Sequence, residues 1–297
     1  MDFWMKTIDQ KTQPMDTGVG GSGSSDPGAT MSKQFALELP LTNRSFSDAL
    51  AVLTSSPAKD CYIHVNVHHG LSLYTDSLGV VQMELLLAPD FFIQFHVRGD
   101  CMLLVNVQDL ARCNTLINDK DVDKVELKYN MDKEAADEFL CCHTHEASSN
   151  MAFVHRVTLN VIQYGNTDKT WSTAKFGNEI QVPTRVLHCA LTKVFYSGLV
   201  YLQFIVKNMF FKLNGRNDTC KKTSVNVPVN WQLDHQFQFS LEAAKVTILV
   251  QALKKVETEY VKILYTVQNL RAIRFEFPVH GNNSRFVVQS AAAADDY

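Results

Sequence analysis

Four amphipathic segments recur along this chain, and each is followed by segments in which apolar and polar residues alternate. Apolar residues spaced i, i+3, i+4 predict helices, and strict alternation predicts half-buried strands. The helices are predicted at residues 45–55, 109–117, 183–195 and 242–255. This order predicts an α+β fold rich in strands, with a function that depends on shape more than on catalytic chemistry.

The two halves of the pattern match each other in spacing. In the first and third helices, Leu50 and Ala190 hold corresponding positions 140 residues apart. In the second and fourth helices, Cys113 and Ile248 correspond at a distance of 135 residues. Two similar offsets indicate an internal duplication. The sequence therefore predicts two repeated domains, each with two helices and a sheet.

The composition is that of a soluble globular protein, with 46% hydrophobic and 20% charged residues among 297. No apolar run reaches the ~18 residues of a membrane-spanning helix, and the N-terminus lacks the apolar core of a secretion signal. Seven scattered cysteines favour reduced thiols in an intracellular protein over a disulfide framework. The net charge is −3, and the two chain ends carry about −2 each, which leaves about +1 for the core. This balance excludes the strong basic excess of a sequence-specific DNA-binding domain.

A linker-like segment precedes the part of the chain that is predicted to fold. Residues 13–31 are rich in Gly, Ser and Pro, a composition typical of flexible linkers. The predicted divisions are a disordered tail over 1–32, a first domain over 33–163, a connector over 164–178, a second domain over 179–291 and a C-terminal tail over 292–297. The strands are predicted at 35–39, 61–67, 71–75, 80–87, 91–97, 101–107, 123–129, 138–145, 152–163, 200–207, 209–214, 221–229, 236–241, 258–267, 270–278 and 284–289.

Several stretches, taken with the order of the elements, resemble one family. Gly70–Leu87 contains a strand that ends in Asp76-Ser77 before an apolar strand, and APDFFIQFHV followed by CMLLVNVQDLARCNTLI has the order strand, turn, strand, helix. VELKYNMDKEAADEFLCCHTHE resembles the next hairpin, and NEIQVPTRVLHCALTKVF resembles the approach to the third helix. Over about residues 33–290 the chain resembles the DNA sliding clamps, the family of proliferating cell nuclear antigen. The resemblance implies a sliding-clamp fold, in which the helices of both domains lie on one face of the sheets.

The resemblance also implies a function without catalysis. Such a protein encircles duplex DNA as a ring (a trimer) or embraces it as a dimer, and tethers a DNA polymerase or other replication and repair proteins in the nucleus. Helix-borne cations lining the hole would meet phosphates without reading sequence, although exposed Lys and Arg also occur on ordinary solvated helices. These helices carry fewer Lys and Arg than those of a typical replicative clamp. The residues expected to face DNA are Arg44, Arg112, Lys120, Arg185, Lys193, Lys245, Lys254 and Lys255.

The resemblance places the contacts between subunits on two strands, 138–145 and 221–229. An unpaired strand edge is a template for pairing with another chain, and Pro228 suits such an edge. The residues expected at the interface are Phe139, Cys141, His143, His145, Thr223, Val225 and Val227. The residues expected to form a pocket for partner proteins on the outer face are His69, Leu71, Tyr164, Trp171, Phe286 and Val288. For Trp171, packing of the connector onto its own sheet is an equal alternative.

The sequence contains no arrangement that favours catalysis. Cys141, His143 and His145 would share one face of a strand, but only three ligands would converge and no second Cys/His pair stands at zinc-finger spacing. The glycine-rich stretch lies in the tail and lacks the Lys-Ser/Thr of a phosphate-binding loop. We therefore expect no enzyme activity, no metal and no cofactor. Two other functions remain open: a subunit of a heterotrimeric DNA-damage checkpoint clamp, and a structural β-rich protein of a virion.

Overall fold

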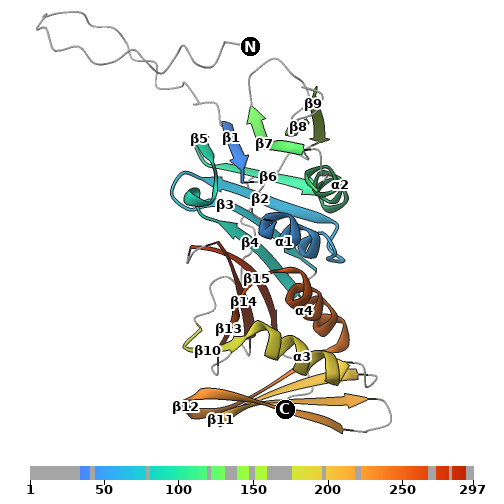
Figure 1. The fold of residues 1–297 in the computed structure, drawn as a ribbon, viewed down its shortest axis with the longest axis vertical. Coiled ribbons are helices and arrows are strands. Elements are labelled where there is room, and N and C mark those ends of the chain that lie inside the picture. The colour runs from blue at the N-terminus through green and yellow to red at the C-terminus, as the bar shows by residue number, and fades with distance from the viewer. Residues whose placement is uncertain are drawn as a thin grey trace, which may run out of the picture. The chain divides into compact units, whose positions relative to one another are not determined.

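Strands make up most of the described chain, and four α-helices interrupt them (Figure 1). The structure is a computed structural model that describes residues 34–40, 44–77, 81–118, 122–130, 139–146, 151–158, 176–195, 199–217, 222–266, 272–280 and 283–291. All of them belong to one unit, Ser32–Tyr297. The helices are α1 (Ser45–Leu53), α2 (Val107–Ile117), α3 (Thr184–Phe195) and α4 (Ala243–Lys255). Each helix lies where the apolar periodicity of the sequence predicts it.

The first sheet has five antiparallel strands in the order β5-β1-β7-β8-β9. These strands are β1 (Gln34–Leu39), β5 (Gln94–Arg98), β7 (Val122–Asn130), β8 (Phe139–Glu146) and β9 (Met151–Thr158). The strand predicted at 91–97 begins later, because a short 3₁₀ helix, η1 (Pro89–Phe91), takes its first residue. Pro89 favours this turn, since its fixed φ and missing N–H suit the start of a helix.

The second sheet has eight strands in the order β10-β13-β14-β15-β4-β3-β2-β6. Its first-half strands are β2 (Asp60–Asn66), β3 (Gly70–Asp76), β4 (Val81–Leu87) and β6 (Cys101–Asn106). Its second-half strands are β10 (Asn178–Pro183), β13 (Tyr260–Tyr265), β14 (Ala272–His280) and β15 (Ser284–Ala291). Strand β10 was not predicted: the predicted connector ends at 178, the predicted helix begins at 183, and no element is predicted for residues 179–182 between them. The antiparallel pairing of β15 with β4 joins the two halves of the chain, with Phe286 opposite Leu85.

The third sheet is a single long hairpin made of β11 (Leu199–Asn217) and β12 (Lys222–Glu242). The sequence predicts two strands in the place of each. Instead, each of the two strands is continuous, and the pairing register shifts on both sides of Asn208. Such irregularities bend a strand without ending it.

The strand order repeats between the two halves. In the first sheet β1, β7, β8 and β9 are consecutive neighbours, and in the second sheet β10, β13, β14 and β15 follow the same order. Strands β2, β3, β4 and β6 correspond in chain order to successive segments of the β11–β12 hairpin. The fold therefore has the two pseudo-repeated halves that the sequence predicts.

The four helices form one continuous row, α2-α1-α4-α3, in which each helix contacts the next. They lie on the same side of the sheets in Figure 1. At the middle of the row, where the halves meet, Ser55 Oγ donates a hydrogen bond to Gln251 Oε1 at 3.0 Å. The helices bury their apolar stripes against the sheets, as Phe46, Ala49 and Leu50 of α1 illustrate. This row is the surface that the clamp resemblance assigns to DNA.

The turn between β2 and β3 requires glycine at position 70. Gly70 has a φ of +86°, and a Cβ on it would lie 1.9 Å from the carbonyl oxygen of Leu87. We expect Gly70→Ala to lower the free energy of unfolding by more than ~2 kcal/mol, because a positive φ alone costs an L-residue roughly 1–2 kcal/mol and the clash adds to it. Urea unfolding measures the loss. Gly177→Ala is the matched control, since no atom lies within 4 Å of its Cβ position, and an unchanged Gly70→Ala variant would contradict the turn geometry.

Candidate nucleic-acid interface and strand edges

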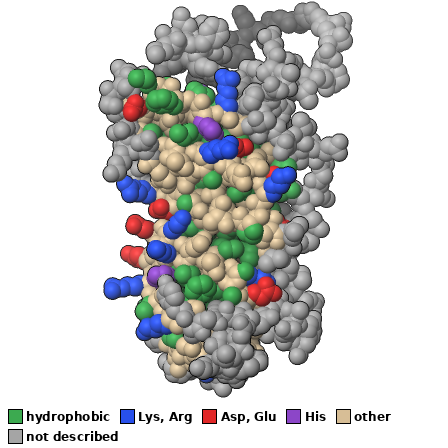
Figure 2. Space-filling view, turned by 90° about the vertical axis from the view of Figure 1, so that its right-hand side faces the viewer, with side chains coloured by type: hydrophobic (Ala, Val, Ile, Leu, Met, Phe, Trp, Pro, Cys, Tyr) green, Lys and Arg blue, Asp and Glu red, His purple; other side chains and the backbone are tan. Residues whose placement is uncertain are grey.

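The helix row carries most of the cations that the sequence assigns to the DNA-facing surface. Six of the eight are exposed there: Arg44, Arg112, Arg185, Lys193, Lys254 and Lys255. Lys120 lies outside the described residues. Figure 2 shows the side of the molecule on which the helices lie in Figure 1, and its Lys and Arg side chains stand apart on a largely uncharged surface.

Lys245 does not belong to this exposed set, because only 7% of the residue is accessible. The sequence predicts that the fourth helix buries Leu241, Ala244, Ile248 and Ala252. Leu241 and Ala252 are buried as predicted, but Ala244 is exposed and Ile248 is only partly buried. The structure buries Val246, Leu249 and Leu253 together with Ala252. This packing turns most of Lys245 inward, and only a small part of the residue reaches the surface.

Acidic residues on the row offset part of its positive charge. Arg112 Nη1 forms an ion pair with Asp109 Oδ1 at 2.8 Å. In α1, partial burial raises the pKa of Asp48 above its ordinary value of 3.8, and the carboxylate of Glu257 raises it further, whereas Arg44 and Lys255 act in the opposite direction. Asp48, Arg44, Lys255 and Glu257 thus form a mixed group with no net charge where α1 meets the end of α4.

We expect Asp48→Asn to raise the free energy of unfolding at pH 7. The folded chain holds the Asp48 proton more tightly than the unfolded chain does, so this carboxyl lowers stability as the pH rises from 3.8 through the raised pKa. The gain from Asp48→Asn should therefore shrink as the pH falls towards 4, and urea unfolding at several pH values measures it. Asp109→Asn is the control, because it removes an exposed ion pair and should lower stability slightly, by ~0–1 kcal/mol. A destabilised Asp48→Asn variant at pH 7 would show that Asp48 acts through a favourable contact.

Among the described strands, β5 and β9 are the two outer strands of the five-stranded sheet, and the predicted strand 138–145 is not an edge. Strand β8 lies inside the sheet, paired with β7 on one side and β9 on the other. The interface residues predicted on β8 (Phe139, Cys141, His143, His145) therefore have no free backbone edge to offer. On β9, Met151, Phe153 and Val154 are 57%, 51% and 46% exposed. The prediction missed this edge because the sequence predicts a strand at both places, and only the topology separates an inner strand from an outer one.

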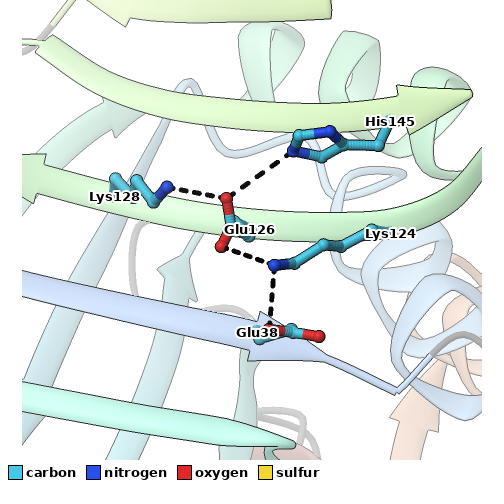
Figure 3. A network of polar contacts seen from close by, with 5 residues as sticks. All are labelled: Glu38, Lys124, Glu126, Lys128 and His145. Atoms are coloured by element: carbon cyan, nitrogen blue, oxygen red, sulfur yellow. Dashed lines mark hydrogen bonds and ion pairs between the residues drawn. The ribbon is translucent and has the colours of Figure 1, made fainter. Parts of the chain in front are cut away.

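The outward side chains of β7 and β8 interact within their own sheet (Figure 3). Lys128 and Lys124 lie 2.6 and 3.1 Å from the carboxylate of Glu126, Lys124 also reaches Glu38 at 3.2 Å, and His145 lies 3.8 Å from Glu126. Partial burial acts to raise the pKa of Glu126, but the hydrogen bonds from Lys128 and Lys124 outweigh it and lower the pKa. His145 is thus part of a surface charge network on the sheet.

Cys141 and His143 share the outward face of β8 with His145, as the predicted alternation requires, while Cys142 and Thr144 are buried. Burial lowers the pKa of His143 below its ordinary value, and Lys128 acts in the same direction. Among the described residues, no group of three or more His, Cys, Asp or Glu side chains is placed to hold a metal ion.

The second predicted edge, 221–229, lies on β12. Residues 222–228 pair with 210–216 of β11, and within the described chain no other strand pairs with them. Thr223 and Val225 are half-buried, and Val227 is 1% exposed. Val225 and Val227 pack towards the hydrophobic core, so they form the inner side of this edge.

The residues predicted to form a pocket for partner proteins do not come together at the surface. His69 is exposed in the β2–β3 turn, but Leu71, Phe286 and Val288 are buried core side chains. Tyr164 and Trp171 lie outside the described residues. Alternation along a strand sorts side chains into two faces, and these three belong to the face that packs under the helices.

None of the helices that the structure describes is long and apolar enough to cross a membrane.

No protein-family model matches the sequence, and no curated protein matches it significantly. Among solved structures, the chain is similar to the crystal structure of the proliferating cellular nuclear antigen from Entamoeba histolytica, with a TM-score of 0.68 and 14% sequence identity. The similarity covers 87% of this chain and 98% of that chain. Together with the helix row and the repeated strand order, it shows that this chain has the fold of a DNA sliding clamp.

Proposed function

We propose that this chain is a non-catalytic sliding clamp, whose copies pair into a ring around duplex DNA and tether a DNA polymerase or other replication and repair proteins in the nucleus. The observation that carries the proposal is the β15–β4 junction inside the chain. The repeat supplies the same two strands a second time, as β9 and as residues 222–228 of β12. Neither has a second strand partner among the described residues.

The repeat also gives the register that this second junction would adopt. The inward residues Leu140 and Cys142 of β8 correspond to Ile273 and Phe275 of β14. When β8 and β14 are aligned in this way, the β8–β9 and β14–β15 pairings make Phe153 the counterpart of Phe286.

For the other edge, the two hairpins are aligned at the residue pairs that close them, Asp76–Gln82 between β3 and β4 and Arg216–Lys222 between β11 and β12. This match places Val225 at the position of Leu85. Because Phe286 faces Leu85 within the chain, Phe153 of one copy is expected to face Val225 of the next.

This contact joins two different surfaces, so it is a head-to-tail contact. Such contacts build a closed ring when the rotation between copies closes, and an open filament when it does not. A closed ring pairs β9 and residues 222–228 at once, which protects two strand edges that would otherwise pair with any available chain.

The helix row supports a sliding role for the surface inside the ring. Its exposed cations are few and spread out, and phosphate contacts carry no sequence information. Weak, non-specific contacts of this kind allow movement along the duplex. Retention then depends on the closed ring, and affinity for the duplex can stay low.

The deciding experiment is retention on circular DNA. Subunits are mixed with a circular plasmid under dissociating conditions and returned to conditions of assembly, so that rings close around the DNA. Gel filtration then separates bound from free protein, before and after the plasmid is cut once. We expect retention on the circle and release after cutting. Retention that is the same before and after cutting, or no retention on either form, would contradict the proposal.

A second experiment measures the oligomeric state. Light scattering is expected to show self-association, most simply a trimer. A chain that stays monomeric at all concentrations would instead fit a subunit of a heterotrimeric checkpoint clamp, since that ring needs two different partners to complete it.

A further inference from the structure

We infer that the second half of each subunit makes the DNA contact, through Arg185, Lys193 and Lys254, and that the helices of the first half form an electrically neutral spacer. The inference rests on the proposed clamp function, because it concerns the surface that such a ring turns towards DNA. It differs from the expectation of an evenly basic lining, which all eight predicted cations together would provide.

The cations of the first half are offset locally. In α2, Arg112 is held by Asp109 at 2.8 Å, and these two are the only charged residues of that helix. In α1, the only charged residue is Asp48. Arg44 stands directly before the helix and interacts electrostatically with Asp48, without an ion pair between them. Each of these helices, counted with the residue that precedes it, is therefore neutral. Lys120, outside the described residues, is flanked in the sequence by Asp119 and Asp121.

The cations of the second half lack such partners. Helix α3 contains no acidic residue, and both Arg185 and Lys193 are exposed on it. Helix α4 has no acidic residue either, and Lys254 is exposed in its last turn. Within the described chain, no ion pair involves any of these three side chains.

Lys254 forms no ion pair within the described chain, either with Glu257, three residues after it, or with Glu242. Glu242 stands at the opposite end of α4, twelve residues earlier in the chain, or ~18 Å along the helix axis. That separation exceeds the Debye length of ~8–10 Å at physiological salt. Lys255 is different, because it lies within the mixed group of Asp48, Arg44 and Glu257. We therefore leave it out of the DNA-contacting set.

A cation that is already paired gives little to DNA binding. Binding to a phosphate releases a condensed counterion and adds ~0.9 to the slope of log K against log salt. A guanidinium such as that of Arg112 must first give up its carboxylate, and the freed carboxylate of Asp109 then repels the phosphates. Unpaired side chains meet neither obstacle. The contact with DNA should therefore be uneven, with one basic helix pair per subunit around the ring.

Two matched double variants of the full chain test this inference. Arg185→Gln with Lys254→Gln removes two exposed cations from the second half, and Arg44→Gln with Arg112→Gln removes two from the first half. All four side chains are exposed, so both variants should fold, which circular dichroism and light scattering check. Binding of a fluorescein-labelled linear duplex of mixed sequence is followed by anisotropy over a series of salt concentrations.

The second-half variant should reduce the magnitude of the slope of log K against log salt by ~1.8 for each subunit that contacts the DNA. The first-half variant should leave the slope unchanged. Equal losses in both variants, or a loss confined to the first half, would overturn the inference while leaving the clamp function in place. Wild-type protein that binds neither this duplex at low salt nor a circular plasmid would contradict the clamp function itself.

Discussion

Replacing Phe153 with glutamate is expected to abolish self-association and to leave the folded chain intact. The side chain is 51% exposed in the isolated chain, so the fold does not depend on it. In the proposed ring it becomes buried opposite Val225 of the next copy. Burying an unpaired carboxylate at that position costs several kcal/mol, and ~4 kcal/mol already weakens an association about a thousandfold.

Light scattering and sedimentation measure the outcome. The wild type should form an assembly at micromolar concentration, and the Phe153→Glu variant should be monomeric with unchanged circular dichroism. Retention on circular DNA should disappear as well, because a ring that does not close cannot trap a circle. Weak binding to linear duplex should remain, since the helix row is untouched.

Ile93→Glu is the matched control. Ile93 is even more exposed, at 62%, but it precedes β5 at the opposite edge of the same sheet. The substitution adds the same charge to an exposed apolar site away from β9, so the assembly should survive. Dissociation by both variants would point to a general effect of surface charge, and an intact assembly in Phe153→Glu would place the subunit contact elsewhere.

The helices could be predicted from the sequence because their signal is local. Apolar residues at i, i+3 and i+4 place α1 to α4 within two residues of their observed ends. The buried side of α4 could not be predicted in the same way. Its sequence, AAKVTILVQALKK, contains so many apolar residues that two stripes fit equally well. Packing against α3, β11 and β12 selects the stripe with Val246 and Leu249, and so decides that Lys245 is buried.

The residues of the candidate site could be predicted less well, because their positions depend more on the order of the strands in the sheets than on the local pattern of apolar residues. The sequence predicts a strand at both β8 and β9, but it does not show which of the two has a neighbouring strand on both sides. The choice of the wrong edge assigned Cys141, His143 and His145 to a subunit interface, where the structure gives His145 to a network within the sheet. The interface at Thr223, Val225 and Val227 stays a prediction. Its hairpin is closed by local sequence, and among the described strands only β11 pairs with these residues.

Phe286→Ala is expected to destabilise the folded chain by ~3–5 kcal/mol, the usual cost of truncating a buried phenylalanine. Phe286 is fully buried, its ring centroid lies 6.0 Å from that of Phe277, and it faces Leu85 across the β15–β4 junction. The cavity would therefore open where the two halves are joined. Urea unfolding measures the loss. A variant with wild-type stability that binds partner proteins less well would restore the sequence-based assignment of Phe286 to a partner pocket.

The repeat supplies an internal comparison for this result, because Phe153 occupies the position in β9 that Phe286 occupies in β15. Phe153→Ala removes the same side chain from a junction that is proposed to form between copies and not within one. Its effect on unfolding should therefore depend on protein concentration, since assembly stabilises the folded chain only when copies associate. The loss in Phe286→Ala should persist at every concentration. If both losses were independent of concentration, the β9 edge would be packed within its own chain, and the equivalence between the two junctions would be wrong.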